Sequence, residues 1–144
     1  MWIVFALTAS MLWGLLYVLN EQVYKYISIG TSFVIASLAG TVFFFVLAMQ
    51  QGVFFKDLHV LSTNRHVQIL LAVDIAVFLL AELFIAMSIT QKNATLAGIV
   101  EISYPVFIAI FAYYIFREDT LNISTIAGAL LIFAGILVVY HFNH

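Results

Sequence analysis

The fold is decided by residues 67–116, which read VQILLAVDIAVFLLAELFIAMSI, then TQKN, then ATLAGIVEISYPVFIAIFAYYIF. The first and last of these stretches, 67–89 and 94–116, are each long and apolar enough to cross a lipid bilayer, which takes about 20 helical residues at a rise of 1.5 Å each. Only residues 90–93 separate them, so the two spans must reverse direction at once. This region therefore predicts an antiparallel hairpin of two membrane-spanning helices.

Three further apolar stretches lie outside this hairpin, at about residues 2–19, 31–49 and 123–140. Of the 144 residues 65% are hydrophobic and 8% are charged, with a mean hydropathy of +1.16. A water-soluble domain of this size could not bury so much apolar surface. We predict an all-α integral membrane protein whose residues 1–144 form a single domain of five transmembrane helices.

Several other classes of protein are disfavoured by what the chain contains. A net charge of −2 does not indicate nucleic-acid binding, and the chain has no Cys. Its His residues are scattered without metal-ligand spacing, and no phosphate-binding loop or nucleophile motif is present. We therefore expect neither an enzyme nor a metal or cofactor. The first apolar stretch is interpreted as a retained span, and the loop 50–66 as containing a short amphipathic segment at the membrane interface.

Three carboxylic acids, Asp74, Glu82 and Glu101, lie deep inside the hairpin, where no Lys or Arg accompanies them. An ionisable side chain at the bilayer centre costs about 2.5–3.5 kcal/mol on insertion scales. Such residues usually face the protein interior or a water-filled cavity and mark ion or substrate pathways. The alternative is that the acids are neutral and hydrogen-bonded, and only hold the helices together.

The two glutamates are placed symmetrically about the turn of the hairpin. Glu82 lies seven residues before Ile89, and Glu101 lies seven residues after Ala94. Both should therefore sit roughly 10 Å from the same end of the hairpin. Two carboxylates that face each other at one depth cannot both ionise without strong repulsion, so such a pair would take up and release a proton.

Aromatic residues at helical spacing accompany these acids. Trp13 and Tyr17 share a face of the first span, and Tyr104 falls on the stripe of the fourth span that contains Glu101. We expect them to wall an acidic cavity in which their rings attract cations, the alternative being that they are ordinary packing residues.

Two features bear on movement and assembly. Pro105 interrupts the fourth span, and predicts either a hinge for alternating access or a static kink.

Gly128 and Gly135 share one face of the fifth span, and predict either a dimer interface or packing within one protomer. Five helices are few for enclosing a gated route, which favours pairing into ten. Basic residues number three on the N-terminal side and two on the other, a near tie that would allow insertion in both orientations.

The chain resembles the drug/metabolite transporter superfamily, and in particular a single EamA-type domain of five helices. The resemblance rests on Trp13-Gly14, on AGIVEISYPVF at 97–107, on Glu118 after the fourth span, and on IAGALLIFAGIL at 126–137. It implies a packed-helix transporter of small metabolites or drugs and, for a lone domain, an antiparallel homodimer of ten helices. Small multidrug relatives, which have a similar seven-residue Gly–Gly spacing in the last helix, use a glutamate within the first helix. Here Glu21 lies only at the end of that helix, so their mechanism does not carry over directly.

From these observations we predict a proton-coupled transporter that exchanges small cationic or zwitterionic amphiphiles. Its partners would be the lipid bilayer, a small-molecule substrate, protons and a second copy of the chain, in a multi-pass arrangement in a prokaryotic cytoplasmic membrane. Glu101 and Glu82 would bind proton and substrate, and Asp74 would tune the cavity. Two alternatives are a non-transporting accessory or scaffold protein and a subunit of a lipid-linked sugar translocase, as some small superfamily members resemble.

Overall fold

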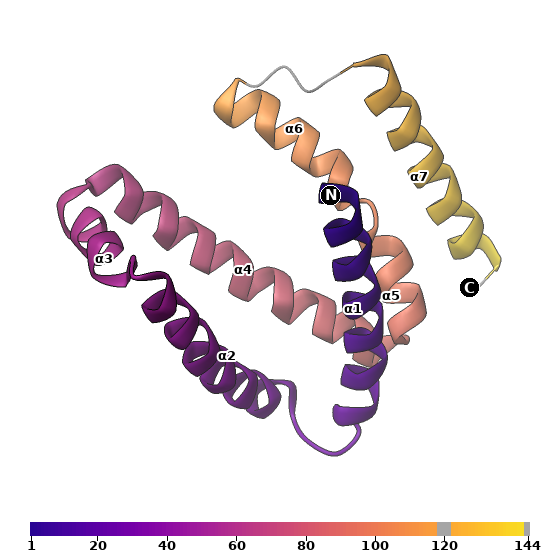
Figure 1. Ribbon diagram of the computed structural model, residues 1–144. Coiled ribbons are helices and arrows are strands. Elements are labelled where there is room, and N and C mark those ends of the chain that lie inside the picture. The colour runs from indigo at the N-terminus through magenta and orange to yellow at the C-terminus, as the bar shows by residue number, and fades with distance from the viewer. Residues whose placement is uncertain (118–121, 143–144) are drawn as a thin grey trace. The chain divides into compact units, whose positions relative to one another are not determined.

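The protein is seen in a computed structural model that describes residues 1–117 and 122–142 (Figure 1). These residues form seven helices and no strand: α1 (Trp2–Val23), α2 (Ile29–Gln51), α3 (Phe54–Thr63), α4 (Arg65–Gln91), α5 (Ala94–Glu101), α6 (Tyr104–Phe116) and α7 (Ile123–Phe142). Glu118, on which part of the family resemblance rests, lies outside the described residues.

The architecture is that of a multi-pass membrane protein, as predicted. Five segments are long and apolar enough to span a bilayer: Trp2–Val23, Ile29–Gln51, Arg65–Gln91, Ala94–Phe116 and Ile123–Phe142. Each begins and ends within four residues of the predicted span. Large apolar side chains are exposed along all five, for example Phe43 at 65% and Phe84 at 64%. Exposed apolar surface on this scale suits lipid as the surrounding solvent.

Helix ends are set by local chemistry at short loops. Ser28 caps α2, its hydroxyl accepting a hydrogen bond from the Thr31 amide, and Gly52 ends that helix in the left-handed conformation at φ 69°. Asn93 caps α5 in the same way through the Leu96 amide. Side-chain oxygens of this kind satisfy amide groups that the first turn of a helix leaves without partners. The turn at 92–93 therefore ends one span and starts the next, which confirms the tight connection.

The predicted segment in the loop 50–66 is the helix α3. Phe54, at its start, packs edge-to-face against Phe45 of α2, with ring centroids 5.2 Å apart. Lys56, Asp57 and His59 follow Phe54 within the first two turns. The helix is thus present where the amphipathic pattern placed it, and its position at the membrane interface stays a prediction.

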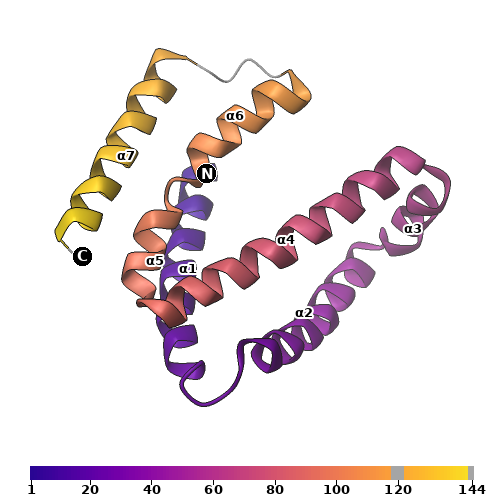
Figure 2. The same ribbon diagram turned by 180° about the vertical axis from the view of Figure 1, so that it is seen from behind.

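The chain divides into two compact units, Gln22–Met87 and the combination of Met1–Glu21 with Ser88–His144. The first comprises α2, α3 and most of α4. The second, which we call the terminal unit, brings most of α1 together with α5, α6 and α7 (Figures 1 and 2). The terminal unit contains the buried side chains of Tyr17, Ile89, Ala94, Ala97 and Ala109. Alanine at several of these positions lets helices approach closely, which is how helices associate in lipid.

Candidate functional site: a tyrosine–glutamate contact at a helix break

One of the intramembrane acids makes a direct contact with an aromatic residue of another helix. The hydroxyl of Tyr17, on α1, donates a hydrogen bond to Oε2 of Glu101, the last residue of α5, at 2.5 Å. Tyr17 is only 9% exposed and Glu101 is half-buried. Because 84 residues separate the two in sequence, this hydrogen bond joins the first and fourth spans of the chain.

A glycine makes room for the tyrosine ring. A Cβ atom placed on Gly98, one turn before Glu101, would lie 3.5 Å from Cδ2 of Tyr17. The ring therefore rests against the backbone surface of α5, where a methyl group would still fit at an ordinary contact distance but a bulkier side chain would push the ring away. Trp13, one turn earlier on α1, meets the same ring edge-to-face at 5.9 Å between centroids. Three of the residues predicted from the sequence, Trp13, Tyr17 and Glu101, are thus brought together.

The fourth span is broken directly after Glu101. Helix α5 ends at Glu101 and α6 begins at Tyr104. At the break the Ser103 amide donates to the Val100 carbonyl at 3.2 Å, and the Val106 amide donates to the Ser103 carbonyl at 3.0 Å. In a continuous helix the amide of residue 105 would donate to the Glu101 carbonyl, but Pro105 has no N–H. The proline thus accounts for a break placed two to three residues before it, and the movement of a hinge there stays a prediction.

A second contact between α1 and α5 involves a residue to which the sequence interpretation gave no role. Oε2 of Glu21, in the last turn of α1, accepts a hydrogen bond from the Ala94 amide at 2.6 Å. Ala94 is the first residue of α5, so a carboxylate lies at the positive end of that helix, where it stabilises the helix dipole. Alternation of the predicted spans places Glu21 and the turn at 90–93 on the same side of the membrane, and this is the signal that could have found the contact.

The other two acids lie in the unit Gln22–Met87. Glu82 is half-buried on α4, and its negative charge acts on Tyr24, which follows the end of α1. Burial raises the pKa of the Tyr24 phenol above its ordinary value of 10.0, and the charge of Glu82 raises that pKa further. Tyr24 is therefore a second residue missed by sequence reasoning. Because Glu82 and Glu101 belong to different units, their facing each other stays a prediction.

The structure does not bring the remaining predicted residues into these contacts. Asp74 is exposed on α4, and Tyr104 is 57% exposed at the start of α6. Among the described residues neither side chain hydrogen-bonds to, or stacks on, another member of the predicted site. Their roles rest on the sequence pattern alone.

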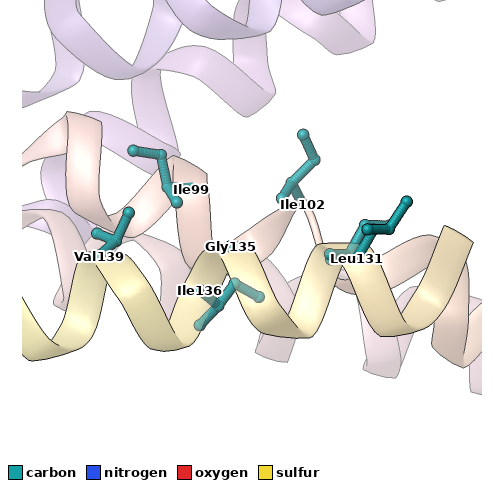
Figure 3. A pocket seen from close by; sticks show the side chains of 7 residues that line it. Ile99, Ile102, Leu131, Gly135, Ile136 and Val139 are labelled. Atoms are coloured by element: carbon teal, nitrogen blue, oxygen red, sulfur yellow. The ribbon is translucent and has the colours of Figure 1, made fainter.

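A pocket of about 380 Å³ lies between α5 and α7 (Figure 3). None of the predicted proton- or substrate-binding residues lines it. Its walls are aliphatic side chains and one glycine, namely Ile99, Ile102, Leu131, Ile132, Gly135, Ile136 and Val139. Gly135 lies on its α7 side, and nothing lies within 4 Å of a Cβ placed on Gly135 or Gly128. Packing among the described residues thus does not require glycine at either position.

Five apolar spans, with a carboxylate hydrogen-bonded between two of them, define a polytopic membrane protein. A sequence model of the EamA-like transporter family matches residues 1–141. The chain belongs to this family, whose members are membrane transporters of small molecules and not enzymes. Comparison with curated proteins found no match. Comparison with solved structures found none either.

Proposed function

We propose that this transporter couples the movement of small cationic or zwitterionic amphiphiles to protons, by exchange at Glu101. The observation that carries the proposal is the hydrogen bond from Tyr17 to Glu101 at the break in the fourth span. A membrane-embedded carboxylate without a basic partner in its own span is energetically costly, and such residues usually mark an ion or substrate pathway. Here it accepts a hydrogen bond from Tyr17, whose ring packs against that of Trp13, and the faces of such rings attract cations.

Competition for one carboxylate would produce the exchange. Ionised Glu101 attracts a cation, and uptake of a proton removes that attraction, so that substrate and proton leave and enter in turn. Tyr17 can hydrogen-bond an oxygen of Glu101 in either state, because a protonated carboxyl group keeps an acceptor oxygen. Glu82 would act as the second proton-binding group, and Asp74 and Tyr104 would complete the cavity.

Alternating access needs an element that can change its angle, and the break after Glu101 supplies one. We propose that α6 moves relative to α5 at residues 102–103, with Pro105 preventing a continuous helix. Discontinuous membrane helices with binding groups at the break are typical of secondary transporters. Opening of the site would thus be linked to the residue that binds the proton.

The working unit would be the single five-helix domain, paired as an antiparallel homodimer of ten helices in a prokaryotic cytoplasmic membrane. The open surfaces at Gly128 and Gly135 support this, because a second helix could approach α7 closely there. A closed two-fold pair would also double the number of helices around the substrate route.

The test is Glu101→Gln in proteoliposomes carrying a proton gradient. Glutamine keeps the size of the side chain and can accept the Tyr17 hydrogen bond, but it cannot ionise. We expect proton-driven accumulation of cationic amphiphiles to fall to that of protein-free liposomes, while the variant unfolds thermally like the parent protein. Asp57→Asn, on α3 and outside the five spans, is the matched control and should retain accumulation.

Undiminished proton-driven accumulation in Glu101→Gln would remove Glu101 from the mechanism. Absence of flux for every solute in the parent protein would favour the non-transporting accessory or scaffold role instead. The two outcomes are separable, because the first concerns only the variant and the second the parent chain.

A further inference from the structure

The break between α5 and α6 leaves backbone acceptors without their usual donors, among them the carbonyls of Glu101 and Ile102. The Glu101 carbonyl has lost its usual donor, since residue 105 is proline, and the Ile102 carbonyl has lost its own, since the Val106 amide donates to Ser103. Among the described residues no other group donates to either oxygen. Within a hydrocarbon layer an unpaired carbonyl is costly, and irregular backbone persists there only where it is buried in protein or lines a cavity.

The same residue also carries a negative side chain. One oxygen of Glu101 accepts the hydrogen bond from Tyr17, and an ionised carboxylate has about four acceptor positions in all. Helices α1, α5, α6 and α7 contain no Lys or Arg that could donate to the remaining positions. Residues 101–102 therefore combine two carbonyl oxygens without donors and a partly used carboxylate, with no Lys or Arg on these four helices to match them.

We infer that the break binds the N–H groups of an ammonium ion, so that the transporter prefers primary amines to quaternary ammonium ions. This inference rests on the proposed function and narrows its substrate class. A primary ammonium group has three N–H donors for the carboxylate of Glu101 and the carbonyls of Glu101 and Ile102. A trimethylammonium group has the same charge and can lie against the rings of Trp13 and Tyr17, but it has no N–H to donate.

The experiment compares matched pairs of amphiphiles that differ only in the head group, one a primary alkylammonium and the other its N-trimethyl counterpart. Binding is measured by calorimetry on the detergent-purified full chain, and flux by counterflow in proteoliposomes. We expect the primary amine to bind about tenfold more tightly or better, because hydrogen bonds involving a charged group contribute at least that factor.

Pro105→Ala tests whether the backbone acceptors are responsible. Alanine restores the N–H that can donate to the Glu101 carbonyl, so the ratio of the two affinities should fall toward one. Val106→Ala alters the neighbouring side chain without changing any backbone donor, and should keep the ratio of the parent protein. The ratio is the readout, so a general loss of transport in Pro105→Ala does not obscure the result.

Each outcome decides a separate point. Equal binding of both head groups by the parent protein would overturn the inference and leave the proposed function intact, since the cations are still bound. An unchanged preference in Pro105→Ala would also overturn it, because the acceptors would then lie elsewhere. Binding of neither head group would instead count against the proposed function itself.

Discussion

The molecule contains two tyrosine–glutamate pairs, Tyr17 with Glu101 and Tyr24 with Glu82. The two pairs have the same kinds of side chain but lie in different surroundings. Tyr17 is buried within α1, rests against Gly98 and donates directly to Glu101 at the break in the fourth span. Tyr24 lies beyond the end of α1, is half-buried, and is affected by Glu82 through its charge. The first pair is therefore built into a contact between two spans, whereas the second joins a span to the segment that follows α1.

The difference shows what makes an intramembrane acid useful. Helices in lipid gain little from hydrophobic association, because the surrounding chains are as apolar as their side chains. Polar contacts and close packing then decide which faces meet. Glu101 has both, since Gly98 lets the Tyr17 ring approach and the Tyr17 hydroxyl then reaches the carboxylate. We therefore expect changes at the first pair to affect transport, and a change of Tyr24 in the second pair to affect mainly stability.

The largest effect is expected from Gly98→Leu, which would separate Tyr17 from Glu101. A leucine there would overlap the tyrosine ring, because even a Cβ atom would already be 3.5 Å from Cδ2. Overpacking of this kind costs about 1–3 kcal/mol, and we expect proton-driven flux to be lost along with the hydrogen bond. Flux in proteoliposomes and thermal unfolding in detergent measure the two consequences.

Two control variants make this prediction specific. Gly98→Ala places its methyl group at an ordinary contact distance and should keep most of the flux. A Cβ atom at Gly135, on α7, has nothing within 4 Å. We therefore expect Gly135→Leu to leave the unfolding of the monomer unchanged while weakening the proposed dimer, as measured by light scattering. Full flux in Gly98→Leu would show that the Tyr17–Glu101 contact is dispensable.

A smaller effect is expected from removing the second contact between α1 and α5. Glu21→Ala leaves the Ala94 amide without its carboxylate partner and takes a negative charge from the start of α5. Loss of a hydrogen bond to a charged group costs about 1.5–3 kcal/mol. Glu21→Gln keeps an acceptor oxygen and should lose less stability than Glu21→Ala. Comparing the two variants separates the contribution of the hydrogen bond from that of the charge. Thermal unfolding in detergent is the measurement, with the exposed neighbour Gln22→Ala as the control.

This prediction is contradicted if Glu21→Ala unfolds at the temperature of the parent protein. It would then follow that the Glu21–Ala94 hydrogen bond is not needed to hold α1 against α5. A further result sharpens the comparison, because weakening of α1–α5 packing by Glu21→Ala should also reduce flux, whereas a change at Tyr24 should not.

The five spans were predictable because length and hydropathy set them almost independently of packing. The hydrogen-bond partners of the acids could not be predicted in the same way. The spans are apolar on nearly every side, so the sequence does not show which face of α1 meets which face of α5. The pattern identified Trp13, Tyr17 and Glu101 but did not pair the last two, and Glu21 was dismissed because it ends its span. Pro105 marked the interruption, while the break itself begins at Ile102, since a proline removes the donor for the carbonyl four residues before it.

The smallest effect concerns the second pair and its dependence on pH. Burial, aided by the charge of Glu82, raises the pKa of Tyr24 above 10.0, so the folded protein holds this proton more tightly than the unfolded chain does. The stability gained from this is fully present below pH 10 and is lost as the pH rises through the folded-state pKa. Tyr24→Phe should therefore lose less stability than the parent protein between pH 9 and pH 11, measured by thermal unfolding in detergent.

Tyr26→Phe is the control, because Tyr26 is 86% exposed and its loss should leave the alkaline profile unchanged. Identical profiles for Tyr24→Phe and the parent protein would mean that neither burial nor Glu82 raises the pKa of this phenol in the folded protein, and the second pair would no longer stand as a counterpart to the first.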